Sequence, residues 1–463
     1  MSNFHWFLIL FSIVLLKSST IFAQDSDSIL IESIEIEGNK KTKAIVILRE
    51  IPFQQGEYTD KQNLEIIKEE IHNNLKNTGL FNYVVVNFIE KTNNLSVKII
   101  LEERWYFWPY PILEHSDRNI NAWLSDSPLE MINYGVFFTQ YNFRGRDEIL
   151  RFKVRLGYKE QFAAEYSSPA IDKNRDLGIT IKAAYFRQHK TPVLTIDNKL
   201  VYLENKDAFI KTYSDFEAGI VYRPGLYLKN YFTIGYNSMK ISEEILQLNP
   251  LYSVDSNAST NFFKFRYTFT WDKRDYIYFP TKGYQFRLRA ENKFFTTNSS
   301  NKYLLETITE IKLFSTISNK FFAANGISVK KSLDKSQPYF LKEGFGFEYN
   351  LRGYEYYVID GNNFVLNSNS LYFNILPMKI REFSIIPFEK FKKIHYSLYT
   401  NIFFDAGMVF DKYALDKTML NEFLFSFGAG FNLVTYYDRV FRIDFSVNKK
   451  MEPGLFIHFA SPI

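Results

Sequence analysis

The 463-residue sequence contains no cysteine, which excludes disulfides, thiolate metal sites and cysteine nucleophiles. Its six histidines are scattered, and none belongs to an H-E-x-x-H pattern. The sequence also lacks a G-x-S-x-G elbow, a P-loop and a dinucleotide-binding fingerprint. The net charge of +5 is small for this length and does not indicate nucleic-acid binding. We therefore expect no enzymatic activity, no catalytic residue, no cofactor, no metal and no nucleic-acid partner.

Long apolar runs are scarce as well. Trp6 to Leu16 form an apolar segment of signal-peptide length, and Ala23 precedes Gln24 at a position suited to cleavage. A membrane-spanning helix needs about 20 apolar residues, and Lys17 ends this run early. Residues 1–23 are therefore predicted to be a cleaved signal peptide, although no lysine or arginine precedes Trp6. A retained anchor is the alternative.

Aromatic residues, in contrast, are abundant. They make up 18% of the chain, with 47 Phe and 32 Tyr, while charged residues make up 23%. The mean hydropathy is −0.21. A transmembrane β-barrel combines these properties, because only alternate residues of its strands face lipid.

Residues 28–104 are predicted to form a small α+β domain with the order β-α-α-β-β. Thr59 to Gln62 fit a capping box at the start of the second helix, and Gly79 is suited to its end. The expected elements are a strand at Leu30–Glu37, a helix at Lys43–Glu50, a second helix with Leu64, Ile67, Ile71 and Leu75 on one face, and strands at Phe81–Ile89 and Leu95–Glu102. By pattern alone, a generic α+β domain remains an equal alternative.

From Trp105 onward the hydrophobic pattern has a period of two, which indicates β-strands. Phe263, Phe265 and Tyr267, for example, alternate with Lys264 and Arg266. A water-soluble β-sandwich would seldom place so many basic residues opposite its apolar face, whereas the lumen of a barrel gives them water. Residues 105–463 are therefore predicted to form a transmembrane antiparallel barrel of roughly 16 strands, with roughly 14 or 18 as alternatives.

Four short motifs occur along the barrel segment. Each is weak alone, but their order and spacing are specific together. They are Tyr141–Arg146 followed by Tyr166–Pro169, Asp272–Asp275 followed by Pro280–Gly283, Leu351-Arg352-Gly353-Tyr354, and Phe403-Phe404-Asp405-Ala406-Gly407.

In this combination the chain resembles the BamA/TamA-type outer-membrane assembly barrels, the bacterial surface antigen family, and the related two-partner secretion transporters. Ile31–Asn39 and Leu75–Val84 resemble the corresponding parts of a POTRA repeat. The resemblance implies one periplasmic POTRA domain, able to add client segments to a sheet edge, and a barrel in the bacterial outer membrane.

The resemblance also implies a role for the third and fourth motifs. The loop carrying Leu351, Arg352, Gly353 and Tyr354 would fold into the lumen as a lid, and Arg352 would pair with Asp405 on the wall strand that carries Phe404 and Gly407. Arginine suits such a pair because its planar guanidinium binds carboxylate through two hydrogen bonds. The alternative is a surface arginine, with Asp405 paired to other lumen charges.

Two further expectations concern turns and the first barrel strand. Asp272, Arg274 and Asp275 are expected to form a solvated turn, with Pro280 and Gly283 fixing its geometry. Pro109 and Pro111 lack N–H groups on the same strand edge. If that edge faces the last strand, near Gly454–Ala460, the junction would be a lateral gate. The alternative is that the prolines only mark the linker before the barrel.

These features favour an outer-membrane factor that inserts or translocates β-rich clients through its POTRA domain and its seam. The alternatives are a secretion pore of the two-partner type and a lipid-handling barrel. Two-partner transporters usually carry two POTRA domains and an N-terminal plug helix, for which Gln24–Ser28 is too short. A barrel hydrolase would need a Ser/His/Asn set that the histidines here do not suggest.

The expected partners are unfolded outer-membrane or secreted clients, outer-membrane lipids and accessory lipoproteins. The chain also lacks the terminal aromatic residue that outer-membrane barrels usually carry.

Overall fold

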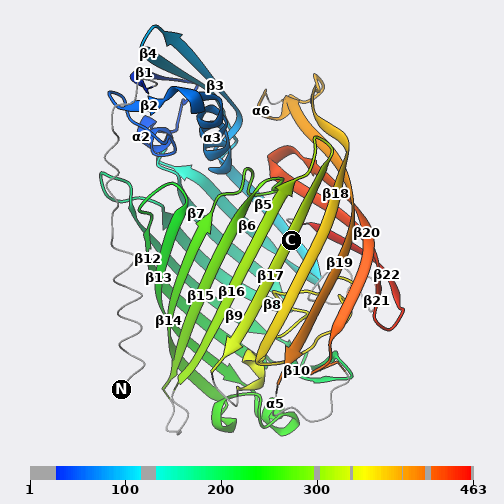
Figure 1. Cartoon of the computed structure of the whole chain (residues 1–463). Helices are drawn as coiled ribbons and strands as arrows, with labels where there is room; N and C mark the ends of the chain where they lie inside the picture. Colours follow the sequence, from blue (N-terminus) through cyan, green and yellow to red (C-terminus); the bar gives the residue numbers. More distant parts are fainter. Residues whose placement is uncertain are drawn as a thin grey trace, which may run out of the picture.

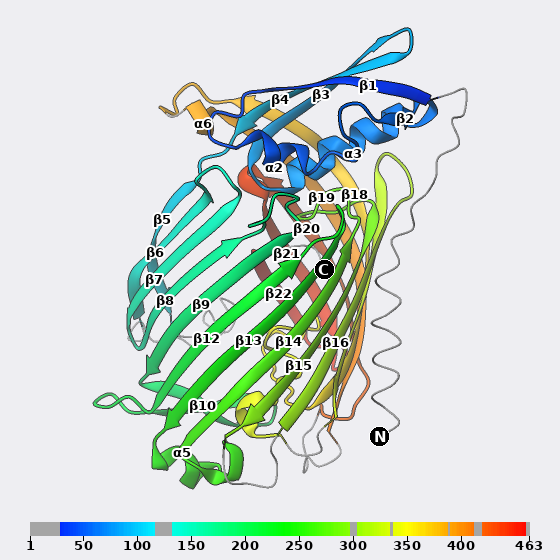
Figure 2. The ribbon, with the colours of Figure 1, turned by 90° about the vertical axis from the view of Figure 1, so that its left-hand side faces the viewer.

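A computed structural model describes residues 28–115, 132–296, 303–333, 337–387, 389–411 and 419–459. The expected signal peptide and the last four residues lie outside the described residues. The chain forms a small N-terminal domain followed by a large β-barrel, and the domain sits over one mouth of the barrel (Figures 1 and 2).

The N-terminal domain packs its helices on one face of a four-stranded sheet. The strand order is β2-β1-β4-β3, with β1 parallel to β4 and the other pairs antiparallel. Its core contains fully buried aliphatic residues such as Ile31, Ile71 and Leu75. The elements are β1 (Ser28–Glu37), α2 (Ala44–Leu48), β2 (Tyr58–Asp60), η1 (Lys61–Asn63), α3 (Leu64–Asn77), β3 (Phe81–Lys91) and β4 (Asn94–Glu103).

The expected order of this domain was incomplete, because the three-residue strand β2 pairs with the start of β1. A strand this short has no alternation to read from the sequence. Asp60, not Thr59, is the capping residue, since its Oδ1 accepts a 2.8 Å hydrogen bond from the Gln62 N–H. The cap belongs to the short 3-10 turn η1 that precedes α3.

The barrel is one sixteen-stranded sheet in which each strand pairs antiparallel with its neighbours, from β5 to β22. The hairpin of β10 and β11 lies outside this order. None of the helices in the described part of the chain is long and apolar enough to cross a membrane. The strands are β5 (Phe107–His115), β6 (Ile132–Phe143), β7 (Glu148–Gly157), β8 (Lys159–Ser168), β9 (Leu177–Gln188), β10 (Lys190–Ile196), β11 (Lys199–Glu204), β12 (Lys211–Tyr222), β13 (Leu228–Ile241), β14 (Ser259–Asp272), β15 (Gly283–Phe295), β16 (Tyr303–Thr316), β17 (Phe321–Ser332), β18 (Asn363–Glu382), β19 (Lys393–Phe410), β20 (Leu424–Thr435), β21 (Arg439–Asn448) and β22 (Pro453–Phe459).

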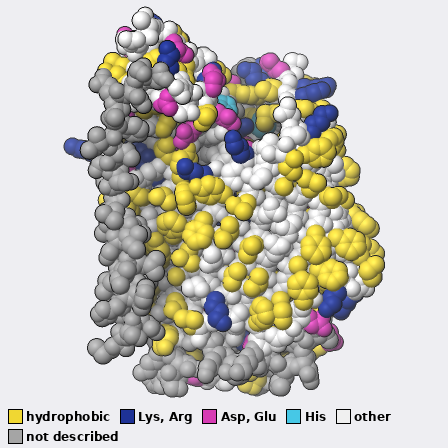
Figure 3. Space-filling view, viewed as in Figure 1, with side chains coloured by type: hydrophobic (Ala, Val, Ile, Leu, Met, Phe, Trp, Pro, Cys, Tyr) yellow, Lys and Arg dark blue, Asp and Glu magenta, His cyan; other side chains and the backbone are white. Residues whose placement is uncertain are grey.

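Alternation along the strands separates an apolar outer wall from a charged lumen, as expected for a membrane barrel. Phe263 and Phe265 on β14 are exposed outward, while Lys264 between them is buried inside. Figure 3 shows apolar side chains spread over the outer wall. The end of the barrel opposite the N-terminal domain is covered by an apolar cluster that includes Ile245 of the short helix α5 (Glu243–Leu248) and Tyr252.

Candidate functional site

The segment between β17 and β18, described for residues 337–362 and here called the lumen loop, packs against the inner wall. Its residues Phe345, Leu351, Tyr354 and Ile359 share one buried cluster with side chains of β18, β19 and β20. The loop is also braced internally, because Phe345 and Ile359 exchange two backbone hydrogen bonds of 3.0 and 2.9 Å. It therefore has a defined position inside the barrel.

Arg352 and Asp405 form a buried, two-pronged ion pair. The Arg352 Nε and Nη2 atoms each lie 2.6 Å from one oxygen of the Asp405 carboxylate, and the side chains are 6% and 1% exposed. Arg352 also donates to the Ser370 hydroxyl at 3.1 Å and to the Asn369 carbonyl at 3.3 Å. Its guanidinium carbon lies 3.9 Å from the centre of the Phe403 ring, a distance typical of a cation–π contact. The structure thus brings together the two residues that the motifs singled out.

The other motif residues shape the contact between loop and wall. Gly353 has φ +86°, a left-handed conformation that favours glycine. The Tyr354 hydroxyl donates to the Phe425 carbonyl and accepts from the Lys449 N–H, both at 3.2 Å. A Cβ atom at Gly407 would lie 2.8 Å from the Phe345 ring, so this glycine makes room for the loop. Phe404 instead faces outward and is exposed.

The lumen loop also contacts the last strand, which sequence reasoning missed. The rings of Tyr356 and Phe456 lie 5.2 Å apart, and Phe456 is almost fully buried. One residue along, a Glu355 carboxylate oxygen lies 3.5 Å from His458 Nε2. The loop therefore holds β22 through side chains, in addition to its attachment to β19.

The strands β5 and β22 are the two ends of the sheet, and we call their junction the seam. β5 keeps an uninterrupted register with β6 from Phe107 to His115, across both Pro109 and Pro111. A proline nitrogen turned toward β6 would interrupt that ladder. The nitrogens of both prolines therefore face the seam, where they offer no hydrogen-bond donors.

At the end of the barrel near the N-terminal domain, aromatic side chains from three segments meet across the seam. Trp108 of β5 lies 5.0 Å from Tyr437 and 5.9 Å from Phe391, both edge-on. The backbone N–H of Trp105 donates to the Tyr437 hydroxyl at 2.9 Å. Phe391 belongs to α6 (Glu389–Lys392), between β18 and β19, and Tyr437 to η4 (Tyr436–Asp438), between β20 and β21. We call Trp105, Trp108, Phe391, Tyr436 and Tyr437 the aromatic clasp.

Tyr437 has an unusual backbone for a bulky residue. The φ angles of Tyr437 and Asp438 are +56° and +59°. Two-residue hairpin turns with this left-handed conformation normally contain Asn-Gly. A left-handed conformation costs roughly 1–2 kcal/mol in a residue with a side chain. The clasp gives a physical reason for a tyrosine here. Its sequence signal is an aromatic pair in a turn where glycine is expected.

The first two motif turns hold the N-terminal domain on the barrel. In the β6–β7 turn, Asn142 donates to the Thr42 hydroxyl at 2.8 Å, and the Gly145 carbonyl accepts from the Lys43 N–H at 2.8 Å. A Cβ atom at Gly145 would lie 2.0 Å from the Lys41 carbonyl oxygen. Glycine at this position therefore permits the domain to approach.

The expectation of a solvated turn at Asp272, Arg274 and Asp275 was wrong. Arg274 is 10% exposed and its guanidinium binds the Asp272 carboxylate at 2.6 and 2.8 Å. Asn77 of α3 donates to the Asp275 carbonyl at 3.2 Å and accepts from the Ile277 N–H at 3.0 Å. The turn is therefore covered by the N-terminal domain, a contact that spacing along the chain could not reveal.

Charged residues reinforce this interface. Glu50 binds the Arg223 guanidinium at 2.5 and 2.7 Å, and Arg104 lies 2.5 Å from the Asp438 carboxylate. Burial opposes the charge of Arg104, but the adjacent Asp438 raises the pKa of the guanidinium. Burial and the nearby Glu50 carboxylate raise the pKa of Asp147 to about 7, despite basic side chains around it. Asp147 is thus a carboxylate at this interface whose charge changes near neutral pH.

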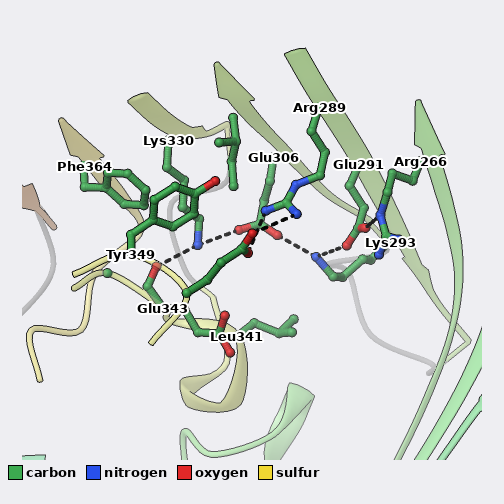
Figure 4. A pocket seen from close by; sticks show the side chains of 13 residues that line it. Arg266, Arg289, Glu291, Lys293, Glu306, Lys330, Leu341, Glu343, Tyr349 and Phe364 are labelled. Carbon is green, nitrogen blue, oxygen red and sulfur yellow. Dashed lines mark hydrogen bonds and ion pairs between the residues drawn. The ribbon is translucent and has the colours of Figure 1, made fainter. Parts of the chain in front are cut away.

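A cavity of about 240 Å³ separates part of the lumen loop from the wall, and Figure 4 shows its lining. Lys293 lies 2.8 Å from Glu291 and 2.5 Å from Glu306. Lys330 lies 3.1 Å from Glu306 and donates to the Glu343 backbone carbonyl of the loop at 3.0 Å. These compensated charges suit a water-filled lumen and attach the loop at a second point.

A sixteen-stranded barrel with a loop fixed in its lumen and one α+β domain on its mouth defines an outer-membrane barrel of the POTRA-bearing class. The family model described as Omp85 superfamily domain matches residues 142–451, and the model for the surface antigen variable number repeat, a POTRA domain, matches residues 29–104. The chain therefore belongs to the Omp85 superfamily and is a bacterial outer-membrane protein.

A solved structure gives the same picture of the fold. CdiB from Escherichia coli aligns with 12% identity and a TM-score of 0.52, over 93% of this chain and 75% of that chain. BamA from Haemophilus ducreyi lacking POTRA domains 1–3 aligns with 16% identity and a TM-score of 0.48, over 93% and 83% of the two chains. The comparison with curated proteins returned no significant match.

Proposed function

We propose that this protein inserts β-rich client proteins into the bacterial outer membrane, without enzymatic chemistry and without a cofactor. The observation that carries the proposal is the seam, because β5 and β22 end a sheet whose other neighbouring strands are all joined by backbone ladders. The edge of a strand is a template for pairing with another chain. Pro109 and Pro111 weaken the hydrogen-bonding capacity of this edge, which favours its opening as a lateral gate.

The lumen loop favours a lateral route over a route through the lumen. Passage of a polypeptide through the barrel would require the loop to leave the wall, breaking the Arg352–Asp405 pair and the contacts of Tyr354. Among the described residues no backbone ladder joins β5 to β22, so opening the seam breaks no ladder there. Secretion of a partner protein through the lumen is therefore the second candidate.

We place the POTRA domain in the periplasm, where it would receive unfolded clients. Its strand β3 is an end strand of the sheet, and Val85 and Ile89 on β3 are exposed. A client segment could pair with this edge by β-augmentation. The aromatic clasp lies between this domain and the seam, so that movement of the domain would affect closure of the seam.

Depletion of the protein, followed by quantification of the outer-membrane proteome, tests the proposal. Insertion predicts loss of several barrel proteins from the membrane. Loss of a single secreted protein would instead support a secretion pore, and altered lipid asymmetry with an intact proteome would support lipid handling. A photoreactive group at Leu113, an exposed residue of β5, should crosslink to client strands in the first case only.

A further inference from the structure

The hairpin of β18 and β19 extends beyond the rim of the barrel. The register of β18 with β17 ends at Phe373, and that of β19 with β20 begins at Tyr396. Residues 375–395, described except for residue 388, therefore project past the neighbouring strands, and we call them the projection. Figure 2 shows it running along the rim toward β5, where Phe391 contacts Trp105 and Trp108.

One side of the projection is attached to the protein. The Lys390 backbone carbonyl accepts a hydrogen bond from Asn82 at 3.4 Å, and the Lys393 carbonyl accepts one from the Tyr83 hydroxyl at 3.3 Å. Lys390 Nζ also donates to the Arg104 carbonyl at 3.0 Å. The position of the projection is therefore fixed by the POTRA domain and by the clasp.

The other side continues the lipid-facing wall. Residues directly opposite each other in a ladder share a face, and the register pairs Leu371 with Ile402, which is 62% exposed on the outer wall. Further along β19, Tyr396 and Ile394 lie on the same face as Ile402. Their partners on β18 are Lys379 and Arg381. The outward face of β18 thus changes from apolar to basic where it leaves the barrel. Figure 3 shows basic side chains above the apolar wall in this region.

The exposed surface of the projection combines these two basic residues with uncovered apolar side chains. Met378 is 50% exposed and Ile385 is 89% exposed. Within the described parts of the chain, Lys379 and Arg381 make no ion pair. Basic residues beside apolar ones, at the boundary of a membrane-spanning wall, suit the phosphate headgroups and upper acyl region of a lipid leaflet.

We propose that the projection is a docking surface for anionic phospholipid headgroups of the leaflet on the POTRA side of the membrane. Arg381 and Lys379 would bind the phosphates, while Ile385 would enter the headgroup–acyl boundary. The inference rests on the membrane position of the barrel and is independent of the function proposed above. Pro377 and the two basic residues lie on the free edge of β18, and such residues oppose the addition of another strand. The features therefore favour lipid over a client strand as occupant.

Lipid crosslinking in nanodiscs tests the proposal. The chain has no cysteine, so Ile385→Cys provides a single site for a benzophenone label in the full-length protein. Lipid adducts should form in discs containing phosphatidylglycerol and be several-fold fewer in discs of phosphatidylcholine alone. The change K379Q/R381Q should reduce adducts by about five-fold for each charge removed.

The control K61Q/K91Q removes two charges from exposed positions of the POTRA domain and should leave the adducts unchanged. Heat-dependent gel migration of each variant establishes that the barrel is folded. Equal adducts in both lipids, or in K379Q/R381Q and the parent, would overturn headgroup recognition. Adducts to an added unfolded barrel protein in place of lipid would show that the projection binds clients, which also overturns the proposal.

Discussion

Removal of one partner of the Arg352–Asp405 pair should detach the lumen loop from the wall. Asp405→Ala removes both oxygens that bind the guanidinium and leaves Arg352 buried beside the Phe403 ring, with only Ser370 and Asn369 as acceptors. Loss of one partner of a buried pair costs about 3–5 kcal/mol. Because about 1.4 kcal/mol corresponds to tenfold in an equilibrium constant, the fraction of molecules with a detached lumen loop should rise by roughly 10²-fold or more.

Hydrogen exchange measured by mass spectrometry reports this directly. The Val358 amide donates to the Asn198 carbonyl and the Lys449 amide donates to the Tyr354 hydroxyl. Both bonds join the loop to other segments, so exchange of these two amides follows detachment of the loop. In Asp405→Ala both should exchange much faster, while amides in the barrel wall keep their protection. The control is Glu160→Ala, which removes the partner of the half-exposed Arg187 on the far part of the wall and should leave the loop unaffected.

A second variant separates the pair from general damage. Arg352→Met/Asp405→Leu replaces both charges with apolar side chains of similar size, and such replacements of buried pairs are often neutral. Its loop should exchange more slowly than that of Asp405→Ala. Loop exchange within three-fold of the parent in Asp405→Ala would refute the reasoning, as would equal exchange in the single and double variants.

Three further predictions concern the POTRA interface and the seam. Gly145→Ala places a Cβ atom 2.0 Å from the Lys41 carbonyl oxygen at φ +71°. The N-terminal domain should therefore dock less tightly, and protease should cut the segment that joins it to the barrel faster; unchanged cleavage would contradict a docked domain. The pKa of Asp147 is raised in the folded protein to about 7, so stability falls as pH rises from about 4 to 7. Asp147→Asn should therefore raise the melting temperature more at pH 8 than at pH 5, and an equal shift at both would argue against the raised pKa. Tyr437→Ala should loosen the clasp and broaden the distribution of distances between spin labels on β5 and β22, measured by pulsed electron paramagnetic resonance. Phe427→Ala on the outer wall should leave the distribution unchanged, and identical distributions in the two variants would refute a role for the clasp.

The sequence predicted those features that depend on local periodicity. Alternation of Phe263 and Phe265 with Lys264 and Arg266 indicated a wall with lipid on one side and water on the other, and the structure has this arrangement. The length predicted roughly 16 strands and left 14 and 18 open, and the structure has a sixteen-stranded sheet. The three-residue strand β2 was not predicted, because its pairing with β1 is decided by tertiary contact and not by its own pattern.

Contacts between distant segments could be predicted from the sequence only where a motif marked the residues involved. Arg352 and Asp405 were paired through motifs, and Pro109 and Pro111 indicated the weak edge because proline chemistry is local. The aromatic clasp had no motif, only an aromatic pair in a turn where glycine is expected, because Phe391 and Tyr437 gain their neighbours only when three segments meet at one end of the barrel.

Side chains on both sides hold the seam closed. Its backbone hydrogen-bonding capacity is reduced by Pro109 and Pro111, while side chains hold both of its strands: the clasp fixes β5, and Tyr356 and Glu355 of the lumen loop fix β22. Aromatic contacts contribute about 0.5–1.5 kcal/mol each beyond their buried area, so they can be separated one at a time. A continuous ladder would have to break cooperatively. A seam closed by side chains therefore combines a defined resting state with a low barrier to opening, and each half can be weakened independently by mutation.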